Sequence, residues 1–103
     1  MAANVRNRIV VAVRSAQHED EMLVSRAEAK RIVPRFAGFE EVVLDFDGVV
    51  AIGQAFADEL FRVFVAAHPS IRITPVNTAP AVDQMIRRAV AAGAAQNGTG
   101  AQS

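Results

Sequence analysis

The sequence contains no cysteine, which excludes disulfide bonds and thiolate metal sites and is compatible with a reducing compartment. Histidine is also scarce: His18 and His68 lie far apart and do not form a helical metal-binding pair. We therefore predict neither a metal nor a cofactor. No apolar run approaches the roughly 20 residues that span a bilayer, and the N-terminus lacks a charged region followed by a long apolar segment. These absences predict a soluble, cytoplasmic protein with no membrane partner.

An excess of charge of either sign is also lacking. Eleven Lys and Arg residues balance eleven Asp and Glu residues, so nothing draws the chain as a whole toward nucleic acid. Exposed aromatic residues interleaved with basic ones, which are typical of nucleic-acid interfaces, are not expected either. A basic patch would require Arg6, Arg8 and Arg14 to converge with Arg87 and Arg88. We predict no nucleic-acid partner.

The length and the apolar content describe a single domain. The chain has 103 residues, of which 51% are hydrophobic, enough for one core. Residues 1–93 are predicted to form this domain. Residues 94–103 are small, polar and uncharged, and burying them would not offset the entropy lost on ordering. We expect them to form a flexible C-terminal tail.

The first ordered segment is predicted to be a strand. Residues Arg8–Arg14 include four β-branched side chains in a short run without alternation, which favours a strand that is buried on both faces. Met22–Val24 is expected to return beside it as the second strand of a hairpin. The apolar run Ile9–Val13 either lies inside the sheet or forms an edge strand that pairs between chains. The second alternative predicts a homodimer.

A helix is predicted to begin after Ser25. Ser25 and Glu28 have the spacing of a capping box, in which each side chain bonds the backbone N–H of the other residue. Pro34 lacks an N–H and disfavours helical geometry before it, so the regular helix should end just ahead of it. Arg26 is expected on the solvent side of this helix as ordinary solubilising charge.

The remaining pattern alternates strands and helices. Val42–Phe46 is predicted to be a buried strand, Gln54–His68 a helix with its phenylalanines in the core, and Ile71–Val76 a parallel strand reached by a crossover. A last helix should start near Thr78 and stop at Gly93. The expected fold class is α/β: a small mixed sheet flanked by helices, with an N-terminal β-hairpin followed by α-β-α-β-α.

Two aspartates at the end of the Val42–Phe46 strand suggest the hypothesis that the chain is an enzyme. The string VVLDFDGVV resembles the first motif of haloacid-dehalogenase-like phosphatases, which would make Asp45 the nucleophile and magnesium ligand and Asp47 the acid/base. That family needs a lysine or arginine and a further acidic pair downstream of this motif, spread over a much larger sheet than the remaining 56 residues can build. The sole lysine, Lys30, lies upstream, and the only later acids are Asp58, Glu59 and Asp83. We therefore favour structural roles, with Asp47 forming a turn and Asp45 bonded by loop amides or by an arginine.

A wider resemblance covers residues 23–88. The segments LVSRAEAKRIV at 23–33, VVLDFDGVVAIGQAFADELFR at 42–62 and NTAPAVDQMIRRA at 77–89 resemble the STAS-like family of bacterial domains of unknown function, related to the anti-sigma factor antagonists. The resemblance implies a STAS-like sheet flanked by helices that acts by protein–protein interaction and not by catalysis. It also implies a protein partner, a histidine-kinase-like ATPase or an anti-sigma protein.

The antagonists carry a phosphorylated serine at the turn before the second helix, and this chain departs from them there. No hydroxyl side chain occurs from Phe39 to Pro69, which excludes a phosphoserine switch at that turn. Gln54, Asp58, Glu59 and Arg62, at and after the helix start, are the predicted partner-binding residues. Asp58 and Arg62 are also spaced to pair along the solvent side.

Overall fold

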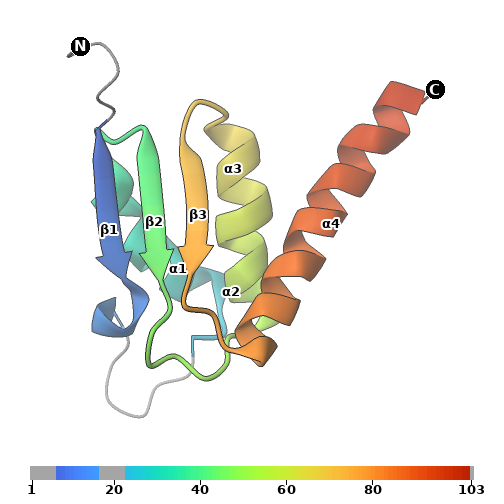
Figure 1. Ribbon diagram of the computed structural model, residues 1–103. Helices are drawn as coiled ribbons and strands as arrows, with labels where there is room; N and C mark the ends of the chain where they lie inside the picture. The colour runs from blue at the N-terminus through green and yellow to red at the C-terminus, as the bar shows by residue number, and fades with distance from the viewer. Residues whose placement is uncertain (1–6, 17–22, 103) are drawn as a thin grey trace.

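Three parallel strands form a sheet in the order β1-β2-β3, and the helices lie behind it and beside it (Figure 1). The computed structural model describes residues 7–16 and 23–102. The strands are β1 (Arg8–Ala12), β2 (Glu41–Asp45) and β3 (Arg72–Val76). β2 is central and pairs in parallel with both neighbours, so the α/β class is confirmed.

The helices fall into two groups. Those behind the sheet are α1 (Arg26–Ile32), α2 (Gln54–Asp58) and α3 (Phe64–Ala67), and α4 (Pro80–Gln102) runs past β3 toward the C-terminus (Figure 1). Short turns complete the path: the 3₁₀ turns η2 (Val13–Ala16) and η3 (Val33–Phe36), and the π-helical turn η4 (Glu59–Val63) between α2 and α3. No helix in the described ranges combines the length and the apolar character needed to cross a membrane.

The hydrophobic core occupies one face of the sheet. Val11, Val42 and Leu44 belong to the buried cluster that includes the apolar side chains of the helices. Side chains alternate along a strand, so Val10 and its neighbour in register on β2, Val43, point to the opposite face. No helix of the described chain covers that face in Figure 1. The predicted burial of the first strand on both faces is therefore wrong: Val10 is 59% exposed.

The capping box forms as predicted. The backbone N–H of Glu28 donates to the Ser25 hydroxyl at 3.2 Å, and the Glu28 carboxylate accepts from the Ser25 N–H at 2.8 Å. The regular helix ends at Ile32, and Pro34 then occupies an early position of the tighter turn η3. Both ends of α1 are thus set by local sequence.

Two details of the predicted topology differ from the structure. The described sheet is parallel throughout, not mixed, and Leu23 makes an isolated parallel bridge to Ile52 instead of a hairpin with β1. The helix start explains this pairing, because Gly53 and Phe56 donate their N–H groups to the carbonyls of Leu23 and Val24 at 2.8 and 3.0 Å. Met22, which was also assigned to the hairpin, lies outside the described residues.

The last helix does not stop at Gly93. α4 begins at Pro80, close to the predicted start, and continues to Gln102. A glycine inside a helix costs only about 1 kcal/mol relative to alanine, so a stretch rich in alanine can continue through it. The predicted domain limit at residue 93 and the flexibility of residues 94–103 remain predictions.

Candidate functional site

Three of the four predicted partner-binding residues lie in one ion-pair network at the junction of α1 and α2. The guanidinium of Arg26 on α1 contacts the carboxylates of Asp58 at 2.8 Å and of Glu59 at 3.5 Å. Arg62 binds Asp58 from the same helix through two hydrogen bonds, with Nη2 2.7 Å from Oδ2. The predicted pairing of Asp58 with Arg62 is confirmed.

The network is partly withdrawn from solvent. The Asp58 and Glu59 side chains are only 14% and 10% exposed, while the Arg26 side chain that covers them is 47% exposed. Hydrogen bonds from Arg62, assisted by Arg26, lower the pKa of Asp58 from 3.8 to about 2, although burial acts in the opposite direction. The same hydrogen bonds raise the pKa of Arg62. Asp58 and Arg62 are therefore both charged at neutral pH, and the two arginine side chains are the more exposed members of the network.

Sequence reasoning missed the role of Arg26. It was expected to be a solvated charge, but it joins α1 to the α2 helix across 32 residues of chain. A capping box starts α1 immediately before Arg26, and nothing in the local pattern signals a partner so distant in sequence. We call the group formed by Arg26, Gln54, Asp58, Glu59 and Arg62 the α2 surface.

Gln54 forms the exposed end of the α2 surface. It is the first residue of α2, and Gly53 before it makes no side-chain cap. Two exposed apolar side chains lie in the segments that meet at this helix start: Val50, 77% exposed, in the loop that leads into α2, and Val24, 47% exposed, beside Gly53. The helix start thus presents an amide and apolar groups next to a fixed cluster of charges.

A π-helical turn interrupts the same helix. Glu59–Val63 separates α2 from α3, and π turns in other proteins are found frequently at functional sites. The core offers a physical reason for it. Phe56, Leu60 and Phe64 are spaced by four residues, and this spacing drifts around a helix of 3.6 residues per turn. The wider turn reduces the drift, so all three side chains remain buried.

The aspartate pair has a structural role on β2. The Asp45 Oδ1 atom accepts the Asp47 backbone N–H at 2.9 Å and the Asn77 side-chain amide at 3.0 Å. These bonds, that of Asn77 foremost, lower the pKa of Asp45. Asp47 is exposed in a turn completed by Gly48, whose φ is 82°. Among the described residues, no cluster of three or more His, Cys, Asp or Glu side chains could hold a metal ion.

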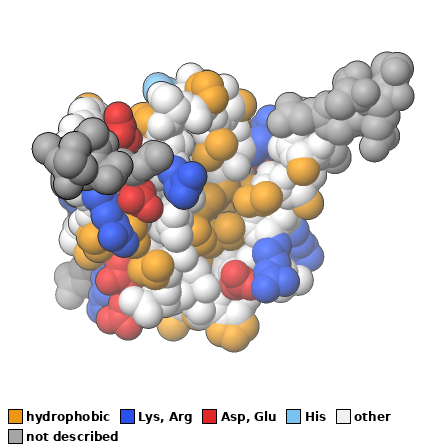
Figure 2. All heavy atoms as spheres, turned by 45° about the horizontal axis from the view of Figure 1, so that its top comes forward, with side chains coloured by type: hydrophobic (Ala, Val, Ile, Leu, Met, Phe, Trp, Pro, Cys, Tyr) orange, Lys and Arg blue, Asp and Glu red, His pale blue; other side chains and the backbone are white. Residues whose placement is uncertain are grey.

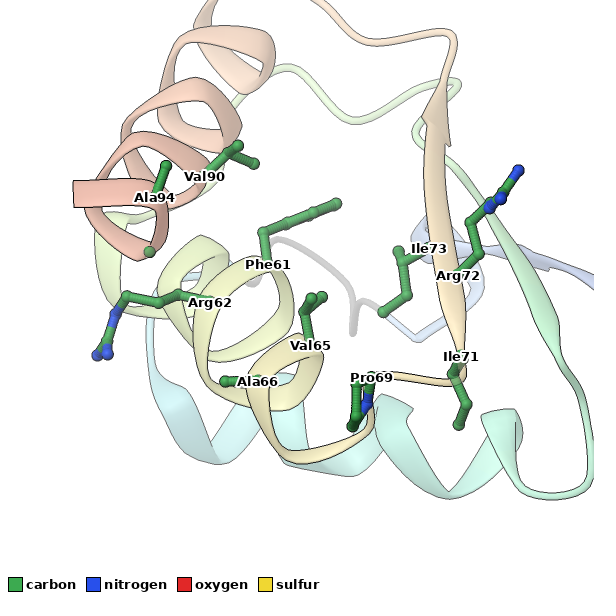
Figure 3. A pocket seen from close by; sticks show the side chains of 11 residues that line it. Phe61, Arg62, Val65, Ala66, Pro69, Ile71, Arg72, Ile73, Val90 and Ala94 are labelled. Atoms are coloured by element: carbon green, nitrogen blue, oxygen red, sulfur yellow. The ribbon is translucent and has the colours of Figure 1, made fainter. Parts of the chain in front are cut away.

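A groove of about 530 Å³ lies between α3, β3 and α4, and sequence reasoning did not foresee it. Figure 2 shows hydrophobic side chains gathered in this hollow, beside the C-terminal helix. In Figure 3, Phe61 and Ile73 point into it, while the guanidinium groups of Arg62 and Arg72 point away. The groove is therefore apolar, and its labelled side chains offer no inward charge that would select a ligand.

The chain is thus a small α/β domain with a parallel sheet, helices on one face and a charged network where α1 meets α2. Its sequence over residues 28–83 matches the family described as the STAS-like domain of unknown function (DUF4325). The chain belongs to this family, as its sequence resemblance indicated. No curated protein and no solved structure matched the chain.

Proposed function

We propose that the chain is a non-enzymatic regulatory domain that acts by binding a protein partner through the α2 surface. The partner class inferred from the resemblance to anti-sigma factor antagonists is a histidine-kinase-like ATPase or an anti-sigma protein. The ion-pair network carries this proposal: it gathers Asp58, Glu59 and Arg62 with Arg26 beside the exposed Gln54. Signalling rests on binding itself, because the turn ahead of α2 has no hydroxyl to phosphorylate.

The fixed geometry of the network favours recognition. Arg26 and Arg62 converge on the same carboxylate, so the two guanidinium groups are held in place before a partner arrives. Side chains that are ordered in advance lose less entropy when a complex forms. Gln54 and the apolar groups of Val24 and Val50 add uncharged area next to these cations.

A single substitution tests the surface without breaking the network. Gln54→Arg adds bulk and charge at an exposed position, and Gln84→Arg makes the same change on an exposed part of α4. Each variant and the wild type serve as bait in an extract of the source organism, and binding is repeated with the purified captured protein. We expect an ATPase or anti-sigma protein whose affinity falls about tenfold or more with Gln54→Arg, equivalent to 1.4 kcal/mol, and is unchanged with Gln84→Arg.

Two results would contradict the proposal. Equal binding by the two variants would remove the α2 surface from the interface, and a captured protein of another class would refute the inferred partner. The catalytic alternative is checked on the same preparations with a generic phosphoester and magnesium. Hydrolysis that Asp45→Asn abolishes and Asp83→Asn leaves intact would show that the chain is a phosphatase.

A further inference from the structure

The outer edge of β1 carries backbone groups with no strand partner in the described chain. The Asn7 carbonyl accepts the Glu41 N–H at 3.0 Å, which fixes the alternation of the parallel ladder. Ile9 and Val11 therefore direct their backbone groups toward β2, whereas Arg8, Val10 and Ala12 direct theirs outward. The Ser15 hydroxyl already donates to the Ala12 carbonyl at 2.6 Å. The other outward groups lie along a strand that ends the sheet.

The opposite edge of the sheet is protected. The Arg72 N–H donates to the Glu40 carbonyl, and the Val76 carbonyl accepts the Phe46 N–H, so these β3 residues direct their backbone groups toward β2. The backbone groups of Ile73 and Pro75 therefore point outward, away from β2. Pro75 has no N–H to offer, and α4 runs beside this strand in Figure 1. Proline, charge and covering helices are the usual means by which proteins prevent edge pairing.

β1 lacks most of these protections. Its sequence, RIVVA, has no proline and no lysine, and the exposed centre of the strand is the apolar Val10. We propose that β1 pairs with β1 of a second copy of the chain, antiparallel and with Val10 opposite the second Val10. Each Val10 then exchanges both backbone hydrogen bonds with its counterpart, and each Ala12 N–H donates to the Arg8 carbonyl of the other copy. The two sheets become one continuous sheet.

Charge complementarity favours a second copy in this register. Arg8 then lies opposite Ala12 of the other copy, on the same face of the sheet, and Ala12 neighbours Asp45 in register. Two strand spacings separate Arg8 from that Asp45, about 10 Å between Cα atoms, and the small Ala12 side chain leaves the path open. Both hydrogen bonds described for Asp45 end on Oδ1, which leaves Oδ2 to accept the guanidinium. Arg8 can turn toward it, because its side chain is 60% exposed and its own pair with Glu41 is 4.0 Å long.

The mass of the full chain in solution tests the pairing. Pairing two five-residue strands buries less surface than the roughly 1,200 Å² that is typical of stable complexes, so the dimer should be weak. Light scattering over a concentration series should therefore show an average mass that rises from monomer toward dimer. Val10→Lys places two like charges face to face and should give a monomer throughout. Val50→Lys, the same change at a more exposed site, should behave as the wild type. A wild type that stays monomeric up to about 1 mM, or a Val10→Lys dimer, would overturn the proposal.

Engineered thiols test the register independently of the lysine variant. The natural chain has no cysteine, so each variant carries a single thiol. In a hydrogen-bonded antiparallel pair the Cα atoms lie about 5.5 Å apart, which suits a disulfide. Val10→Cys should form a disulfide dimer under mild oxidation faster than the control Val50→Cys, whereas Arg8→Cys and Ala12→Cys should cross-link only when mixed. Cross-linking at the control rate, as expected if β1 instead pairs with a different protein, would overturn the proposal, and so would self-linkage of Arg8→Cys.

Discussion

Asn77 donates its side-chain amide to the Asp45 carboxylate across the ends of two neighbouring strands, with Nδ2 3.0 Å from Oδ1. Asn77 follows β3 with a φ of 55°. In the described part of the chain it is the only residue other than glycine with a positive φ. Asparagine tolerates this left-handed geometry better than most residues do. The contact holds the loop after β2 against the turn after β3, so the aspartate of the phosphatase-like string serves the fold.

Two substitutions at Asn77 separate its backbone role from its hydrogen bond. Asn77→Gly removes the bond to Asp45 but keeps the left-handed geometry free of strain, while Asn77→Ala removes the bond and adds strain. We expect both to lower the free energy of unfolding in urea, and the alanine variant to be the less stable of the two by about 1 kcal/mol. Equal stability of the two variants would show that the positive φ is not maintained in solution.

The depressed pKa of Asp58 predicts a loss of stability in acid. The Arg62 hydrogen bonds lower this pKa from 3.8 to about 2, so between these values the unfolded chain binds more protons than the folded chain does. The stabilisation is complete above pH 3.8 and is lost as the pH falls toward 2. We expect the urea midpoint to decrease across this window, and to decrease less steeply in Asp58→Asn. Parallel pH profiles for the two proteins would contradict the assignment to Asp58.

The contact between Arg26 and Asp58 should couple α1 to α2 energetically. A double-mutant cycle with Arg26→Met and Asp58→Asn measures the coupling, and methionine retains most of the apolar stem of the arginine. We expect about 1 kcal/mol, because the Asp58 side chain is 14% exposed. The exposed pair of Arg87 and Asp83 on α4 provides the matched control, with an expected coupling of about 0.3 kcal/mol. A coupling no larger than that of the control would mean that the Arg26 contact does not bind the two helices together.

Local signals in the sequence located most elements of the fold. Ser25 and Glu28 fix the start of α1 within a single turn. Pro34 ends the regular helix because it has no backbone N–H to donate to the preceding turn. The pairing of Asp58 with Arg62 could also be predicted from the sequence, because residues four apart face each other on a helix. In each case the physical cause acts within a few residues, so a single sequence is enough to detect it.

The features that escaped prediction depend on how distant segments pack. The run of β-branched residues around Val10 predicts a buried strand, but Val10 is exposed. It is exposed because the described helices cover only the other face of the sheet (Figure 1). Arg26 meets Asp58 only after α1 has docked against α2, and the Leu23 bridge to Ile52 forms at the same junction. The groove beside Phe61 likewise depends on where α4 lies relative to β3. Hydrophobic periodicity specifies which face of an element is buried, and leaves open which element covers it.

The close approach of Gly53 to Val24 predicts a sharp difference between two glycine-to-alanine substitutions. A Cβ atom on Gly53 would lie 2.8 Å from the Val24 Cα, and this backbone is held by the Phe56 N–H at 3.0 Å. We expect Gly53→Ala to lower the free energy of unfolding by about 1–3 kcal/mol, because the helix start and the Val24 segment must separate. Gly93→Ala is the control: its Cβ meets nothing nearer than the Arg62 Cγ at 3.4 Å, and alanine favours a helix interior. That variant should gain up to about 1 kcal/mol in urea denaturation. If Gly53→Ala proved as stable as the wild type, the segment before α1 could not be packed against α2 in this way, and Arg26 would not be held at the α2 surface.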